Sequence, residues 1–81
     1  MTEQDVKQRI ESGLNGAQVQ VFDTKGTGDH FSVVVISNDF EGKSLVKRHQ
    51  MVYATVSDVL TKELHALQLK TYSYKEWKQE N

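Results

Sequence analysis

The stretch GDHFSVVVI, residues 28–36, decides the fold of this chain. Its last six residues form a nearly continuous apolar and β-branched run, which is typical of a strand covered on both faces or central in a sheet. The preceding segment, Ala17 to Thr24, alternates Val19 and Val21 with glutamines, a pattern typical of a half-exposed strand. Because the turn-rich residues 25–29 join the two segments, we predict a hairpin with a rather long loop whose second strand is central.

Helical patterns lie on both sides of this hairpin. Near the start of the chain, apolar residues recur at every fourth position from Val6 to Leu14, which predicts an amphipathic helix. Thr2 followed three residues later by Asp5 resembles a capping box, and the glycines of residues 13–16 are expected to end the helix.

A second helical region is predicted over Lys43–Glu63, where apolar residues are spaced by three, four and seven positions. One long helix fits this pattern, and so do two shorter ones separated near Ala54–Ser57, because Ser57 and Asp58 offer an internal cap.

A third strand and a short helix complete the pattern. Residues Ala66 to Tyr72 alternate again between apolar and polar side chains, which predicts a strand. Ser73 can cap a last turn in which Tyr74 and Trp77, three residues apart, would pack on the body of the domain.

This order has a chemical consequence for two histidines. A strand that feeds a helix and then a second strand normally forms a right-handed crossover with parallel strands, so both strand starts lie at one edge of the sheet. Adjacent strands lie about 4.8 Å apart. His30 and His65 are therefore expected to lie close together and could share a metal. The chain has no cysteine and only one other histidine, so the remaining ligands would have to come from a partner.

Length and composition narrow the classes of function. With 81 residues, we expect one small domain, residues 1–81, and the nearly balanced charge (net −1, 26% charged residues) argues against wholesale coating of nucleic acid. No apolar run approaches the roughly 18 residues of a membrane span, and the first residues do not resemble an export signal. We therefore expect a cytoplasmic protein with no membrane partner, monomeric or weakly homodimeric when alone.

With this order of elements, three stretches of the chain resemble the BolA family over nearly its whole length: GDHFSVVVIS, F-x-G-K-S-x-V-K-R-H-Q-x-V-Y, and HALQLKTYSYKEW. The residues that carry the likeness are Phe40, Gly42, Ser44, Arg48, His49, Val52, Tyr53, His65, Ala66 and Trp77. The GDHF version of the hairpin loop, with histidine instead of cysteine, looks more like the YrbA-type and mitochondrial-type branches than like the founding morphogene protein.

The resemblance implies an α/β (α+β) domain of the KH-like BolA fold, in the order αββααβα, with a three-stranded mixed sheet and helices mainly on one face. It also implies a monothiol glutaredoxin as partner, with a [2Fe-2S] cluster bridged between the two proteins and glutathione and none bound stably by this chain alone. The family's cluster ligands correspond here to His65 and His30. Asp29 could orient a ligating imidazole, although an Asp after a Gly is also common turn chemistry.

DNA binding is the alternative function, since BolA-type proteins have been regarded as transcription regulators. Its candidate residues surround the start of the second helical region: Gly42, Lys43, Ser44, Lys47 and Arg48. Helix amides at such a start can receive a phosphate, but the acidic Asp39 and Glu41 flank the cluster. Arg48 and Lys47, expected to be exposed, could instead help to dock the protein partner.

Catalysis is the least favoured reading. The chain has no cysteine nucleophile, no G-x-S-x-G elbow and no Walker sequence, and Ser44 after Gly42 is better explained as a helix cap. His49 lies on or beside the apolar stripe, so we predict a hydrogen-bonded packing residue and not a third ligand for a zinc site.

Overall fold

The computed structural model describes residues 1–59 and 66–80. Its elements follow the expected order αββααβα, with a short 3-10 helix in the fourth place. In chain order they are α1 (Glu3–Gly13), β1 (Gln18–Asp23), β2 (His30–Ile36), η1 (Asn38–Phe40), α2 (Leu45–Thr55), β3 (Ala66–Tyr72) and α3 (Tyr74–Glu80).

The three strands form one mixed sheet in the order β1-β2-β3, which confirms that β2 is central. β1 pairs with β2 antiparallel, and β2 pairs with β3 parallel. The parallel register runs from His30 opposite Ala66 to Ile36 opposite Tyr72. Both strands therefore start at the same edge of the sheet, as the crossover rule predicted.

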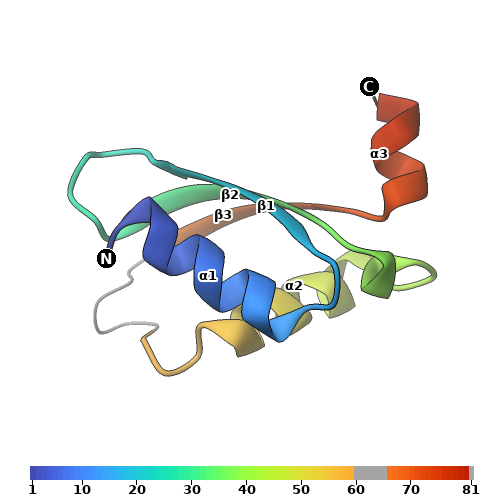
Figure 1. Ribbon diagram of the computed structural model, residues 1–81, viewed down its shortest axis with the longest axis horizontal. Helices are drawn as coiled ribbons and strands as arrows, with labels where there is room; N and C mark the ends of the chain where they lie inside the picture. The colour runs from blue at the N-terminus through green and yellow to red at the C-terminus, as the bar shows by residue number, and fades with distance from the viewer. Residues whose placement is uncertain (60–65, 81) are drawn as a thin grey trace.

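Both longer helices cover the same face of this sheet, as expected (Figure 1). Alternate residues of β2 point into this layer, because successive side chains of a strand point to opposite faces. The core between helices and sheet consists of Val6, Ile10, Leu14, Val19, Phe31, Val33, Val35, Phe40, Val52, Val56, Val59 and Leu67.

The first helix begins and ends as the sequence indicated. The Thr2 side chain accepts from the backbone N–H of Asp5, and the Asp5 carboxylate accepts from the N–H of Thr2, so the capping box is present. At the other end, a Cβ on Gly13 would lie 2.4 Å from Cγ2 of Thr55. Gly13 thus allows α1 and α2 to approach closely, in addition to ending the helix.

The second helix is shorter at its start than predicted. It begins at Leu45, because Ser44 is the N-cap residue and accepts from the N–H of Lys47. It ends at Thr55, within the stretch where a break was considered, and residues 60–63 of the predicted helix lie outside the described residues. Leu45 does not belong to the buried stripe, since it is 63% exposed.

The last helix packs on the body through its aromatic residues, as predicted. The Ser73 hydroxyl accepts from the N–H of Glu76 and caps the helix. The rings of Trp77 and Tyr72 lie 5.2 Å apart, and the Tyr74 hydroxyl donates to the carbonyl of Gly16 at 2.6 Å. These contacts hold α3 at the finishing end of β3.

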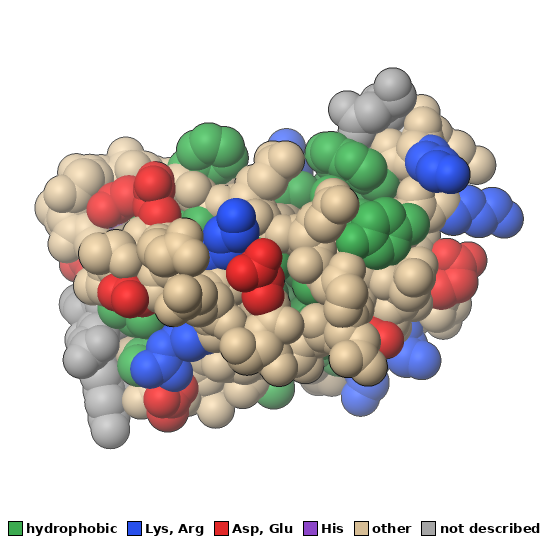
Figure 2. Space-filling view, in the orientation of Figure 1, with side chains coloured by type: hydrophobic (Ala, Val, Ile, Leu, Met, Phe, Trp, Pro, Cys, Tyr) green, Lys and Arg blue, Asp and Glu red, His purple; other side chains and the backbone are tan. Residues whose placement is uncertain are grey.

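Acidic and basic side chains are interspersed on the face that carries α1, while hydrophobic side chains gather beside α3 (Figure 2). No helix within the described part of the chain is long and apolar enough to cross a membrane.

Candidate functional site

The loop between β1 and β2 is organised by one carboxylate at the end of β1. The side chain of Asp23 accepts from the backbone N–H groups of Gly28 and Gly26, both at 2.8 Å, and of Lys25 at 3.3 Å. Partial burial raises the pKa of Asp23, but these backbone hydrogen bonds together lower it more, so it lies below its ordinary value. The loop that precedes His30 is thereby fixed from within.

Gly28 joins this loop to the start of the chain. Its φ is +77°, and a Cβ here would lie 2.7 Å from the carbonyl oxygen of Met1. The amino group of Met1 in turn donates to the carbonyl of Gly28 at 3.0 Å. A glycine is therefore required both by the backbone conformation and by the close approach of the N-terminus.

His30 begins β2 at the rim of the sheet and is oriented by the preceding residue. Its Nδ1 lies 2.8 Å from Oδ1 of Asp29, and Thr27 Oγ1 donates to the same carboxylate oxygen. An ionised carboxylate only accepts hydrogen bonds, so Nδ1 carries a proton and, in the neutral ring, the lone pair lies on Nε2. The side chains of His30 and Asp29 are 30% and 31% exposed, so the imidazole is held in place and still reaches the surface.

The second predicted ligand, His65, lies outside the described residues. The residue that follows it in the sequence, Ala66, starts β3 and is the register partner of His30. The distance between the two imidazoles therefore stays a prediction. Within residues 1–59 and 66–80, no three acidic or histidine side chains gather as a metal-binding group.

The start of α2 carries the residues considered for nucleic-acid binding. Gly42 has a φ of +74° and open space around it, which allows the sharp turn into the helix. Lys43 and Lys47 are exposed, and the Ser44 hydroxyl is used as the helix cap. Ser44 thus has the structural role that argued against its being a nucleophile.

The expectation that Arg48 is exposed is wrong. The residue is only 9% exposed, and its guanidinium binds the Glu76 carboxylate with contacts of 2.6 and 3.3 Å. It also donates to the carbonyl of Lys43 at 3.0 Å and reaches that of Thr71 at 3.5 Å. Arg48 therefore joins α2 to β3 and α3.

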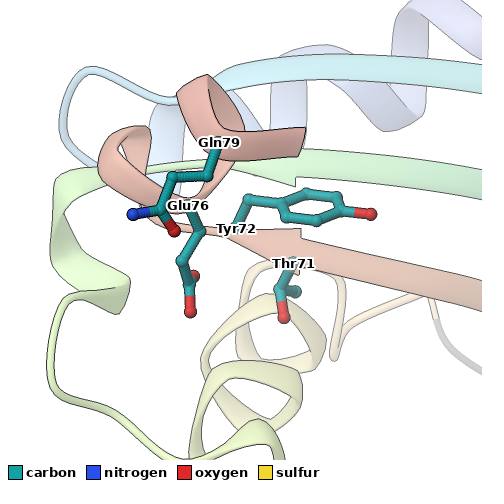
Figure 3. Close-up of a pocket in the computed structure, with 4 residues that line it drawn as sticks. All are labelled: Thr71, Tyr72, Glu76 and Gln79. Atoms are coloured by element: carbon teal, nitrogen blue, oxygen red, sulfur yellow. The ribbon is translucent and has the colours of Figure 1, made fainter. Parts of the chain in front are cut away.

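Glu76 was not singled out in the sequence, yet it is the partner of Arg48. Hydrogen bonds from the Arg48 side chain and then from the Ser73 backbone lower the pKa of Glu76 to about 2. A hollow of about 400 Å³ lies beside it, lined by Thr71, Tyr72, Glu76 and Gln79 (Figure 3). The side chains of Thr71 and Glu76 both point to the side of the sheet where α2 lies.

His49 is partly buried in α2, next to Arg48. Its Nε2 is enclosed and has no hydrogen-bond partner among the residues that the structure describes. The hydrogen bond expected for this residue is thus not observed at that nitrogen. With the imidazole in α2 and His30 at the rim, His49 was rightly kept apart from the proposed ligand pair.

Three comparisons relate this geometry to known proteins. A family model described as "BolA-like protein" matches residues 6–76. The chain is 36% identical over 83 residues to the DNA-binding transcriptional regulator BolA of Escherichia coli, covering 89% of this chain and 79% of that protein. It is 38% identical over 80 residues to Protein BOLA2 of Arabidopsis thaliana, covering 96% and 85%. A solved BolA homologue from Coxiella burnetii matches with a TM-score of 0.79 and 38% identity, covering 96% of this chain and 97% of that one.

Proposed function

The chain belongs to the BolA-like protein family, and from this membership we propose that it is a non-enzymatic adaptor protein. Its partner would be a monothiol glutaredoxin, with which it shares a [2Fe-2S] cluster together with glutathione. The role would lie in iron-sulfur trafficking or in iron and redox signalling.

The observation that supports this proposal best is the state of His30. A partly exposed imidazole lies at the start of β2, and Asp29 holds its Nδ1 so that Nε2 is the nitrogen suited to bind a metal. Metal-ligating histidines commonly donate their other N–H to a carboxylate in this way, which fixes the tautomer and raises the basicity of the ligand. The predicted role of Asp29 is therefore consistent with its contact.

The donor set also fits a shared cluster better than a resident metal. Iron-sulfur clusters are held mainly by thiolates, and this chain has no cysteine. It can contribute only imidazoles, here His30 and His65, while the glutaredoxin and glutathione supply sulfur. Two imidazoles on one iron generally raise the reduction potential relative to thiolate ligation.

The test is to assemble the complex with a monothiol glutaredoxin and glutathione and to record visible absorption and circular dichroism. We expect His30→Ala and His65→Ala each to change the cluster spectrum and the double variant to lose the mixed-ligand signature. His49→Gln, which removes the third imidazole, is the matched control and should leave the spectrum unchanged. An unchanged spectrum in the double variant would overturn the ligand assignment.

Acidification gives an independent check. Imidazole binds a metal only as the neutral base, and histidines ordinarily titrate near pH 6.5. We expect the cluster signature to be lost on acidification before the far-ultraviolet signal of the fold changes.

DNA binding is a second candidate, supported by the exposed Lys43 and Lys47 at the start of α2 and by the printed function of the Escherichia coli relative. Arg48 contributes little to it because its guanidinium is bound to Glu76. Two lysines predict a slope of about −2 when the logarithm of affinity is plotted against that of salt concentration. The affinity of duplex DNA should fall in Lys43→Ala and Lys47→Ala but not in Lys75→Ala on α3. Equal affinities in all three variants would remove this candidate.

A further inference from the structure

The outer edge of β1 presents backbone groups that the sheet does not use. The N–H of Thr24 donates to the carbonyl of His30, which fixes the alternation of the antiparallel ladder. Even-numbered residues of β1 therefore bond to β2, whereas Val19, Val21 and Asp23 direct their N–H and C=O groups outward. The Asp23 N–H confirms this direction, because it donates to the Glu3 carboxylate at 2.8 Å.

The opposite edge of the sheet is protected in a way that the β1 edge is not. On β3, the Tyr53 hydroxyl donates to the outward carbonyl of Leu67 at 3.3 Å, and Arg48 reaches that of Thr71. Exposed strand edges are templates for pairing with another chain, and proteins commonly cover them. Here side chains from α2 cover one edge, while Val19 and Val21 of the other edge receive no such cover from the described residues.

The surroundings of the β1 edge leave room for another strand. A hollow of about 280 Å³ runs along it between α1 and β1, lined by Glu3, Gln4, Lys7, Val19, Gln20, Val21 and Phe22. Phe22, on the open face of the sheet, is 56% exposed. An exposed aromatic residue next to uncovered edge groups favours an interaction surface.

We propose that two copies of this chain pair through their β1 edges, antiparallel, about a two-fold axis at Gln20. In this register Val19 of one copy faces Val21 of the other, and each such pair exchanges both backbone hydrogen bonds, giving about four in total. The register uses every edge group of Val19 and Val21. It also leaves the Asp23 N–H bonded to Glu3.

The same register determines which side chains meet on the open face. Gln20 lies directly opposite the second copy's Gln20, and Phe22 lies opposite its Gln18, which would cover part of the exposed ring. A single strand pair buries less than the roughly 1,200 Å² of a standard interface. We therefore expect weak pairing, with a dissociation constant on the order of 100 µM to 1 mM. The inference does not depend on the cluster proposal, because it uses another edge of the sheet.

The test places charges at the two-fold axis. Gln20→Lys and Gln20→Glu each put like charges directly opposite one another, which should weaken self-association about three- to fivefold. An equal mixture of the two variants should associate at least as tightly as the wild type, since opposite charges then face each other. Gln68, exposed on β3 away from this edge, is the matched control, and its Lys and Glu variants should associate like the wild type.

Association would be followed up to about 1 mM by analytical ultracentrifugation and by the concentration dependence of backbone amide signals in NMR. The β1 amide signals should move most with concentration. A wild type that stays monomeric through this range would overturn the proposal, and so would a mixture no tighter than its components or equal effects at Gln68. Signals of β1 that move only when a glutaredoxin is added would assign this edge to that partner instead.

Discussion

The two ends of the parallel β2–β3 pair hold polar side chains in different ways. At the starting end, His30 is oriented by the adjacent Asp29, in a loop that Asp23 orders from within. At the finishing end, Arg48 binds Glu76, a residue 28 positions away, and so links three elements. A polar side chain bound across several elements is part of the architecture, whereas one oriented locally at a rim is suited to binding something else.

The largest effect on stability is expected at the finishing end. Arg48→Ala removes a nearly buried guanidinium and leaves Glu76 and the Thr71 carbonyl without their partner. We expect the free energy of unfolding to fall by about 2 to 3 kcal/mol, below the range for fully buried pairs because Glu76 is partly exposed. Urea denaturation measures this change. Lys47→Ala, at the exposed neighbouring position, should change it by less than about 0.5 kcal/mol, and similar losses in both variants would contradict the comparison.

Acid should weaken the same end before the starting rim loses its histidine geometry by unfolding. The pKa of Glu76 falls from 4.5 to about 2 on folding, so its contribution is fully present above pH 4.5 and is lost as pH falls towards 2. We expect the stability of the wild type to decline over this window. Glu76→Gln is less stable at neutral pH and should show a shallower decline, which denaturation at a series of pH values would measure. An equally steep decline in Glu76→Gln would mean that another carboxylate dominates.

At the starting end, the loop glycines allow a matched pair of substitutions. Gly28→Ala would combine a positive φ with a contact of 2.7 Å to the Met1 carbonyl, whereas Gly26→Ala has a similar φ and open space. We expect losses of about 2 and about 1 kcal/mol, respectively, in thermal or urea unfolding. Only Gly28→Ala should also shift the NMR signals of the first residues. Equal behaviour of the two variants would mean that the N-terminus does not support the rim.

Local pattern was sufficient to predict most of the fold, but not the long-range polar contacts. Alternation in β1 and β3 and the apolar run of β2 predicted the strands, and the crossover rule then predicted their parallel pairing. The partnership of Arg48 with Glu76 could not be predicted from local pattern, because the two residues meet only after α3 has packed at the end of the sheet. One signal was available, since Arg48 lies four residues before Val52 and eight before Val56 and so falls on the buried stripe of α2.

The candidate site was predicted to the extent that it depends on strand starts. His30 was expected at the start of β2, and the structure has it there; Asp29 was weighed as an orienting group, and the contact exists. The loop network was missed because Asp23 bonds to backbone groups, which any residue possesses and no motif marks. The expected proximity of His65 stays a prediction.

The smallest change in stability is expected for Asp29→Asn, although it bears most directly on the proposed ligand. The residue is partly exposed and its hydrogen bonds lie within the loop, so we expect the free energy of unfolding to change by less than about 1 kcal/mol. The amide can present either an acceptor or a donor to Nδ1, so it no longer requires a proton on that nitrogen. Nitrogen-15 NMR of the imidazole should then show His30 moving away from the Nδ1-protonated tautomer, while His49 keeps its own. If the tautomer of His30 is the same in both proteins, the orienting role assigned to Asp29 is wrong, and the rim would hold its imidazole by the loop backbone alone.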